Sequence, residues 1–183
     1  MLWDIIMLAF PNVSGPVFRL TEDLLAQGFA GSRESSRKRI ILPLHRTQDA
    51  PVQRMLNFFQ PGTYVRPHVH PAPGQVELIQ VLRGRLGFLL FSPEGEVTGL
   101  HDLAAGGDGL IDIEAGQWHG MVCLAPDTVI VEIKKGPYSA TADKAFAAWS
   151  PEEGSPGTIA AEASWSALFS ETSEFRLSEA AMR

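Results

Sequence analysis

The stretch Pro61-Gly-Thr-Tyr-Val-Arg-Pro-His-Val-His70 contains two histidines one residue apart, in a segment whose composition favours a β-strand. Successive side chains of a strand point to opposite faces. His68 and His70 therefore point to the same face and can share one metal ion. We expect a metal site on this strand.

Two more side chains on the same predicted face make the surroundings of that site polar. Counting back along the strand adds Tyr64 and Arg66, provided that Pro67 does not break the alternation. A phenol can act as a general acid or base, and a planar guanidinium binds a carboxylate or phosphate through two parallel hydrogen bonds. We therefore expect Tyr64 and Arg66 to be the catalytic residues.

Two further candidate ligands stand on later strands. Glu77 opens the next predicted strand, which the turn Pro71-Ala-Pro-Gly74 folds back beside the first, and His119 follows the turn Ala115-Gly116. Three imidazoles and one carboxylate suit a divalent ion of iron, zinc, manganese, nickel or cobalt, and the lack of thiolates argues against a structural zinc site. The predicted ligands of this single ion are His68, His70, Glu77 and His119.

Short apolar or alternating runs fill the sequence between Ile40 and Lys134, separated by residues that favour turns. Such a succession of short strands is typical of an all-β sandwich or barrel. The predicted strands are residues 54–60, 64–70, 76–82, 85–91, 97–103, 109–113, 118–124 and 128–134.

Helical patterns flank this β-rich region. Residues 20–27 form a predicted helix with Thr21 as its N-cap, acidic residues in its first turn and Gly28 as its stop. The other predicted elements are helices at 140–149 and 160–169 and a fraying tail at 170–183.

The residues of the predicted metal site resemble the two motifs of the cupin superfamily, G-x5-H-x-H-x3-4-E-x6-G and G-x5-P-x-G-x2-H-x3-N. The matching residues are Gly62, His68, His70, Glu77 and Gly84 in the first motif, and Gly116 and His119 in the second. In the second motif, Glu114 replaces the proline and Cys123 replaces the asparagine.

The first motif leaves a choice between two ligands, because the gap from His70 to Glu77 is longer than the motif allows. The shorter spacing would place the ligand at Gln75. We prefer Glu77, because it keeps the motif's spacing to Gly84 and because a carboxylate binds a divalent cation better than an amide does.

A narrower resemblance covers roughly residues 34–165 and includes Gln53-Arg-Met-Leu56, Trp118-His119 and Lys135-Gly-Pro-Tyr138. These residues look like the WbuC-type cupin-fold metalloproteins, which are associated with bacterial surface-polysaccharide gene clusters. The resemblance implies an all-β fold: a double-stranded β-helix, or jelly-roll barrel, with short flanking helices at both ends. The expected parts are an N-terminal extension at 1–35, a cupin barrel at 36–138 and a C-terminal helical extension at 139–183.

Composition excludes several classes of partner and compartment. The formal net charge is -6 and the basic residues are scattered, so we expect no binding to nucleic acid. The apolar opening of the chain is too short to span a membrane. The only cysteine, Cys123, can form no internal disulfide, which favours a cytoplasmic location. Because exposed sheet edges invite pairing, we expect a homodimer.

Two functions fit these features. The first is a metal-dependent oxygenase, isomerase or lyase acting on a small polar substrate, either sugar-like or a carboxylate. The second is a non-catalytic module that binds or senses a small ligand through its metal. His45 either lines the pocket or is a hydrogen-bonded structural histidine, and the sequence leaves both readings open.

Overall fold

Two antiparallel β-sheets form the body of the molecule in the computed structural model, which describes residues 8–139 and 143–181, with 171–181 as backbone alone. In the described residues the strands are β1 (Arg39–Pro43), β2 (Val52–Phe59), β3 (His68–Val69), β4 (Glu77–Arg83), β5 (Arg85–Phe91), β6 (Val97–Ala104), β7 (Leu110–Ile113), β8 (Trp118–Cys123), β9 (Thr128–Lys135) and β10 (Ala145–Phe146). The helices are α1 (Glu22–Glu34) and α2 (Gly157–Ala181).

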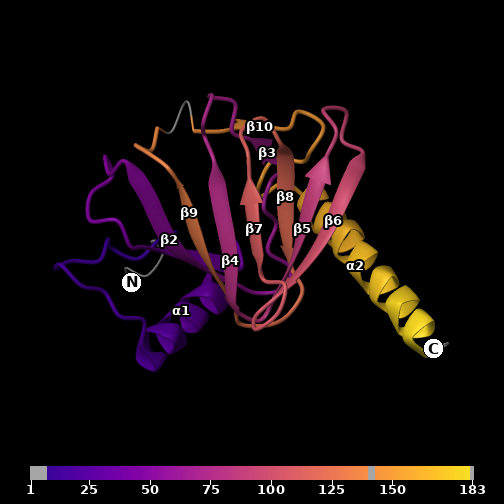
Figure 1. Ribbon diagram of the computed structural model, residues 1–183, viewed down its shortest axis with the longest axis horizontal. Helices are drawn as coiled ribbons and strands as arrows, with labels where there is room; N and C mark the ends of the chain where they lie inside the picture. Colours follow the sequence, from indigo (N-terminus) through magenta and orange to yellow (C-terminus); the bar gives the residue numbers. More distant parts are fainter. Residues whose placement is uncertain (1–7, 140–142, 182–183) are drawn as a thin grey trace.

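The order of the strands makes the fold a jelly roll. One sheet has the order β1-β2-β9-β4-β7 and the other β10-β3-β8-β5-β6. From β2 to β10 the chain changes sheet at every step except the hairpin of β5 and β6, so the strands wind as a double-stranded β-helix. The predicted all-β jelly-roll fold is confirmed. The sheets converge at the bottom of Figure 1 and splay apart at the top, where β3 and β10 lie.

The inward face changes character along the strands. At the closed end the two sheets pack a core that includes Ile79, Phe88 and Ile130, none of them exposed. Further along, the inward positions of β4 and β9 become polar, with Glu77 two residues before Ile79, and Glu132 two residues after Ile130. The alternation of side chains along each strand therefore places apolar residues in the core and polar residues at the open end of the barrel.

Helix α1 begins where the sequence predicts and ends later. The Thr21 side chain accepts a hydrogen bond from the Leu24 amide and caps the helix. Gly28 was predicted to stop the helix, and this was wrong, because the helix continues to Glu34. A Cβ on Gly28 would lie 2.2 Å from the ring of Phe58 on β2, so the glycine instead lets the helix pack closely against the sheet.

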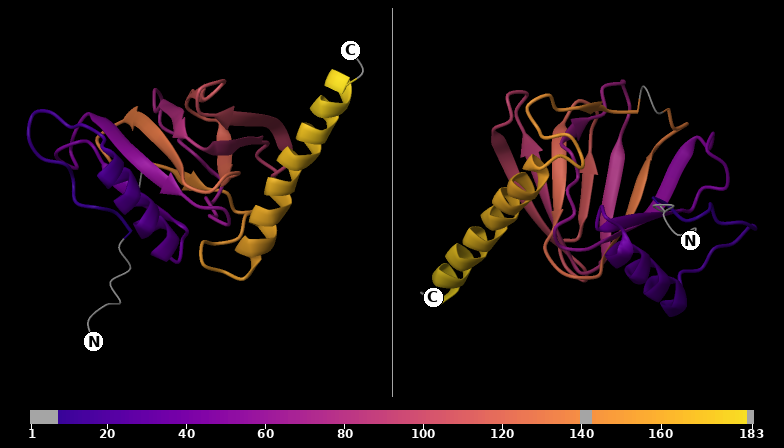
Figure 2. Two further views of the ribbon diagram at one scale, coloured as in Figure 1. Left: turned by 90° about the horizontal axis from the view of Figure 1, so that it is seen from below. Right: turned by 180° about the vertical axis from the view of Figure 1, so that it is seen from behind.

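The C-terminal segment differs more from the prediction. The predicted helix at 140–149 was wrong over residues 143–149, none of which is helical, and Ala145–Phe146 form β10, which pairs with β3. Residues 140–142 lie outside the described part. Helix α2 covers the predicted helix at 160–169 and continues to Ala181, through most of the predicted tail. Its first part packs on the outer face of β5 and β8 through Trp165 and Phe169, and its end extends away from the barrel (Figures 1 and 2).

No helix in the described residues is long and apolar enough to cross a membrane.

Candidate metal centre

Four buried side chains meet between the two sheets at the open end of the barrel. His68 on β3 lies opposite His119 on β8, and His70 follows directly after β3. Glu77 approaches from β4 in the other sheet. One ligand atom of each residue lies within 4.8 Å of those of the other three, and each residue is at most 3% exposed. The structure therefore gathers all four predicted ligands at one point.

Backbone carbonyls fix the orientation of the three imidazole rings. The Nδ1 atom of His68 donates to the carbonyl of Arg66 at 2.9 Å, and that of His119 donates to the carbonyl of Gln117 at 2.9 Å. The Nδ1 atom of His70 donates to the carbonyl of Asp143 at 2.5 Å. Because the carbonyl oxygens can only accept, Nδ1 carries the proton of each neutral ring and Nε2 keeps its lone pair. This support of the rings is typical of histidines that bind a metal.

The atoms at the centre lack hydrogen-bond partners. Glu77 Oε2 lies 3.3 Å from the Nε2 atoms of both His70 and His119, yet all three buried atoms are unsatisfied. A buried polar group without a partner costs roughly 1–3 kcal/mol, so three such atoms facing one another need a common partner. A divalent cation would satisfy them all, and nitrogen and carboxylate donors suit such an ion. The residues present therefore fit a metal ion.

The protonation of the cluster follows from its burial. Burial lowers the pKa of His68 well below its usual value, which keeps that ring neutral. Burial alone would raise the pKa of Glu77, but the neighbouring His119 and His70 lower it overall, so Glu77 is a carboxylate. For His70, burial acts to lower the pKa, while Glu77 outweighs it and raises the pKa. A metal ion therefore has to compete with protons for these groups.

Gln75, the alternative ligand, lies away from the cluster. Its side-chain amide contacts the carbonyl of Lys135 and a carboxylate oxygen of Asp143, each at 3.4 Å. Glu77 is the residue that the β4 register turns inward among the histidines, in agreement with the preference for a carboxylate.

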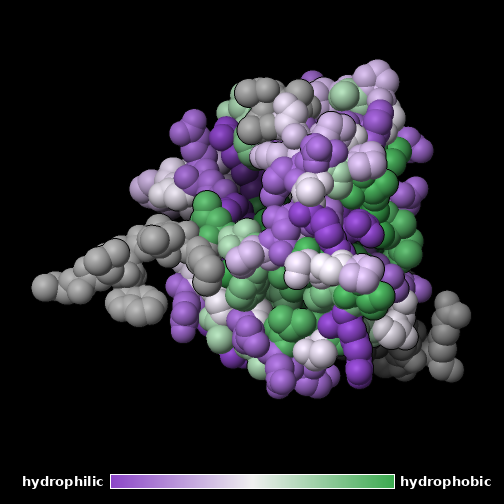
Figure 3. Space-filling view, turned by 90° about the vertical axis from the view of Figure 1, so that its left-hand side faces the viewer, coloured by the Kyte–Doolittle hydropathy of each residue, from purple (hydrophilic) through white to green (hydrophobic). Residues whose placement is uncertain are grey.

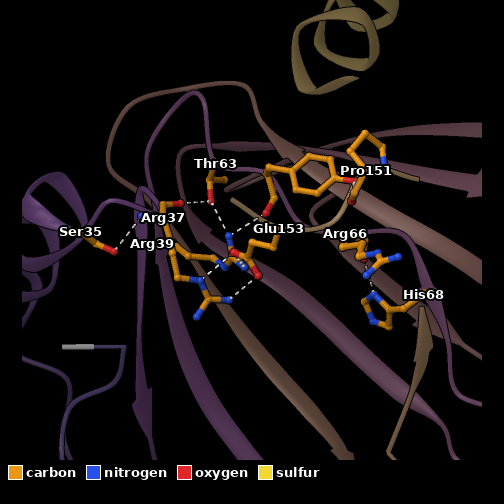
Figure 4. Close-up of polar contacts among 9 residues, drawn as sticks. Ser35, Arg37, Arg39, Thr63, Arg66, His68, Pro151 and Glu153 are labelled. Carbon is orange, nitrogen blue, oxygen red and sulfur yellow. Dashed lines mark hydrogen bonds and ion pairs between the residues drawn. The ribbon is translucent and has the colours of Figure 1, made fainter. Parts of the chain in front are cut away.

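Tyr64 and Arg66 are not where the alternation placed them. The Tyr64 hydroxyl donates to the carbonyl of Pro151 at 2.8 Å, and its ring stacks on Trp165 of α2. The Arg66 guanidinium donates to Ser150 Oγ at 3.3 Å and to a backbone carbonyl. Figure 4 shows Arg66 beside His68, and the contact between them joins the backbone carbonyl of Arg66 to the Nδ1 atom of His68.

The reason is a break in the strand before His68. Only His68–Val69 pair as β3, so residues 64–67 do not follow the alternation, and Val65 lines the cavity in place of its two neighbours. The prediction that Tyr64 and Arg66 face the metal cavity was wrong, because the register does not hold across Pro67.

A cavity of about 470 Å³ adjoins the cluster and includes His68 and Glu77 in its wall. The other polar residues of the wall are Arg37, Arg39, Gln53, Asn57, Glu132, Lys134, Tyr138 and Lys144. Several occupy inward period-two positions of β2 and β9, a signal that the sequence contained. His45 lines the cavity as well, and its Nδ1 contacts the backbone of Arg54. Figure 3 shows the side of the molecule near β2, where hydrophilic residues gather around a shaded hollow in the upper half.

Polar contacts hold the wall next to the cluster. Asn57 donates to Glu132 Oε2 at 2.9 Å, and Lys134 Nζ lies 2.6 Å from Asp143 Oδ2. Burial, followed by the charge of Glu77, raises the pKa of Glu132 to about 7.

Two wound sheets with His-x-His, a glutamate and a later histidine gathered between them are the elements that the two motifs describe. The chain has the cupin fold.

Comparisons with known proteins find one family model and solved structures with low sequence identity to this chain. A family model described as a domain of unknown function (DUF6016) matches residues 20–103. No curated protein matches the sequence. An oxalate oxidase in complex with glycolate is similar in structure, with 16% identity, 62% of this chain covered and a TM-score of 0.47. This chain spans 57% of the length of that oxidase.

Two other solved structures are similar to a comparable degree. KdgF from Halomonas sp. has 21% identity and a TM-score of 0.43, covering 56% of this chain and 82% of its own. An oxalate decarboxylase from Bacillus subtilis has 14% identity and a TM-score of 0.46, covering 59% of this chain and 27% of its own. Likenesses at this distance carry no statement about the activity of this cupin.

Proposed function

We propose that this cupin is a metal-dependent enzyme that acts on a small polar substrate inside the barrel. One observation supports this most: four buried ligand atoms, three of them unsatisfied, converge beside a cavity of about 470 Å³. A site that only stabilised the fold would need no such space, whereas a site that acts on a molecule does.

A divalent ion bound there would polarise a carbonyl or hydroxyl oxygen, or acidify a water molecule. The chain contributes the surroundings. Glu132 and Asn57, held together by their hydrogen bond, are two polar groups of the wall that can contact a substrate beside Glu77. The buried histidines, each fixed by a backbone carbonyl, keep the ligand geometry constant when a substrate enters.

The test is turnover by protein reconstituted with each of the five candidate metals. Nucleotide sugars, keto sugars and small carboxylates are the substrates to screen, with product formation followed by mass spectrometry. We expect turnover of at least one compound that is lost in His119→Ala. Ligands that raise the melting temperature of the metal-loaded protein without any turnover would make it a binding module and contradict the enzyme proposal.

Three finer proposals accompany this one. The resemblance to WbuC-type proteins supports a role connected with surface-polysaccharide metabolism, and the single cysteine supports a cytoplasmic location. The outer strands β1 and β7 of one sheet support a homodimer formed through sheet edges. Light scattering that reports only the 19.9 kDa monomer would contradict the dimer.

A further inference from the structure

Cationic side chains line the cavity, and most of them have carboxylate partners. Arg37 and Arg39 both contact Glu153, at 2.7 and 2.5 Å, which Figure 4 shows. Lys134 contacts Asp143 at 2.6 Å. Each of these three cations therefore has a carboxylate partner, although Arg37 and Arg39 share the one carboxylate of Glu153.

Lys144 is different. It lines the same cavity as His68 and Glu77, and it has neither a hydrogen bond nor an ion pair within the described part of the chain. Its Nζ atom lies 5.8 Å from the centre of the Phe146 ring, a contact that leaves its donors unused. Burial, followed by the charge of Lys134, lowers the pKa of Lys144. Glu132, Glu77 and Asp143 act in the opposite direction on this pKa, but none of them forms an ion pair with Lys144 in the described part of the chain. A partly buried ammonium without such a partner is costly unless a ligand compensates it.

The backbone on either side of Lys144 is held in place. The carbonyl of Asp143 accepts the hydrogen bond from His70, and Ala145 pairs with Val69 in the ladder of β10 and β3. Lys144 is thus fixed next to β3, which carries His68 and is followed directly by His70. These two backbone contacts set the place of Lys144 next to β3.

The charges around the cavity point to the kind of ligand. The cations of its wall are Arg37, Arg39, Lys134 and Lys144. The carboxylates that line it or pair with those cations are Glu77, Glu132, Asp143 and Glu153. The formal charges are four positive and four negative, and the raised pKa of Glu132 removes part of the negative charge near neutral pH. A divalent ion at the centre would therefore leave the cavity with a positive excess. A small anion would remove this excess, and a neutral sugar would not.

We propose that Lys144 binds a carboxylate group of the ligand beside the metal centre, so that small carboxylic acids are the substrate class. The inference rests on the proposed function, because it requires the metal site. A carboxylate would accept charge-assisted hydrogen bonds from the Lys144 ammonium, which are about twice as strong as neutral ones. Lys144 acts here as a binding residue that touches the substrate.

Isothermal titration calorimetry of the metal-loaded full-length protein tests this inference. The probes are oxalate, malonate, succinate and glutarate, each compared with its uncharged diamide and with inorganic phosphate. We expect at least one dicarboxylate to bind more tightly than its diamide and than phosphate. Lys144→Met should weaken that binding at least tenfold, and Lys144→Arg should keep most of it.

Lys135→Met is the matched control, because it removes the same charge from an exposed lysine outside the cavity. The Nζ atom of Lys135 contacts the carbonyl of Pro73. Metal content is measured for every variant before and after titration. Unchanged affinity in Lys144→Met, equal loss in Lys135→Met, or tighter binding of the diamides or phosphate would overturn the inference. A wild-type protein that takes up no metal would instead overturn the proposed function.

Discussion

Glu77 Oε2 and His119 Nε2 lie 3.3 Å apart in the interior, and neither atom has a hydrogen-bond partner. The two atoms come from opposite sheets, so their contact depends on the closure of the barrel. A group that satisfies both would hold the sheets together at the open end, where the apolar core has ended. Metal binding and stability should therefore be linked.

The first prediction follows from this linkage. An ion at one hundred times its dissociation constant should stabilise the fold by about 2.7 kcal/mol, because it binds the folded chain alone. Thermal unfolding of chelator-treated protein, with and without added metal, measures this. Glu77→Gln should lose most of the stabilisation, whereas Gln75→Ala should keep it. Equal metal-dependent shifts in both variants would exclude Glu77 as a ligand.

The sequence predicted the elements in which local pattern and tertiary packing agree. Residues 85–91 are a short, mostly apolar run after a turn and form β5 as predicted. Thr21 caps α1 because capping depends on a few neighbouring residues. The short strand Ala145–Phe146 escaped prediction, because its partner, β3, lies far away in the sequence. Propensity is a weak guide wherever a distant strand decides the structure.

In the candidate site, too, the sequence predicted what depends on local spacing and missed what depends on the arrangement of the sheets. His-x-His spacing and the glycine register pointed to the four residues that now meet between the sheets. Much of the wall of the cavity was missed, because Gln53 and Lys134 look like the polar face of an ordinary strand until the sheet is known to turn them inward. Tyr64 and Arg66 were misplaced, because the alternation was carried across a proline.

The second prediction concerns the packing of α1. Gly28→Ala should destabilise the protein by about 1–3 kcal/mol, because the new Cβ would meet the rigid ring of Phe58. Gly31→Ala is the control in the same helix. Its Cβ would lie 3.2 Å from the flexible end of Ile40, so the gain in helix propensity of up to about 1 kcal/mol offsets the contact. Urea denaturation that gives both variants the same stability would contradict the role assigned to Gly28.

The third prediction concerns pH. Burial acts to raise the pKa of Glu153, but Arg37 and Arg39 lower it overall below its ordinary value of 4.5. A lowered pKa in the folded state means that the carboxylate stabilises the fold above pH 4.5 and that this contribution is lost as the pH falls through the folded-state pKa. Glu153→Gln should therefore be less stable than wild type at pH 7, and the difference should shrink in acid.

Glu152→Gln is the matched control for the pH series, because Glu152 is exposed and forms no ion pair in the described residues. It should follow the wild-type curve. A difference between Glu153→Gln and wild type that stays constant from pH 7 to pH 3 would show that the ion pairs do not cause it.

Metal content tests the central claim most directly. Elemental analysis of freshly purified protein, and of protein reloaded with each candidate metal, should give one divalent ion per chain. His68→Ala/His70→Ala should contain none, because it removes two of the four ligands while leaving the core between the sheets intact. The same metal content in the double variant as in wild type, with the fold confirmed by circular dichroism, would contradict the assignment of this centre.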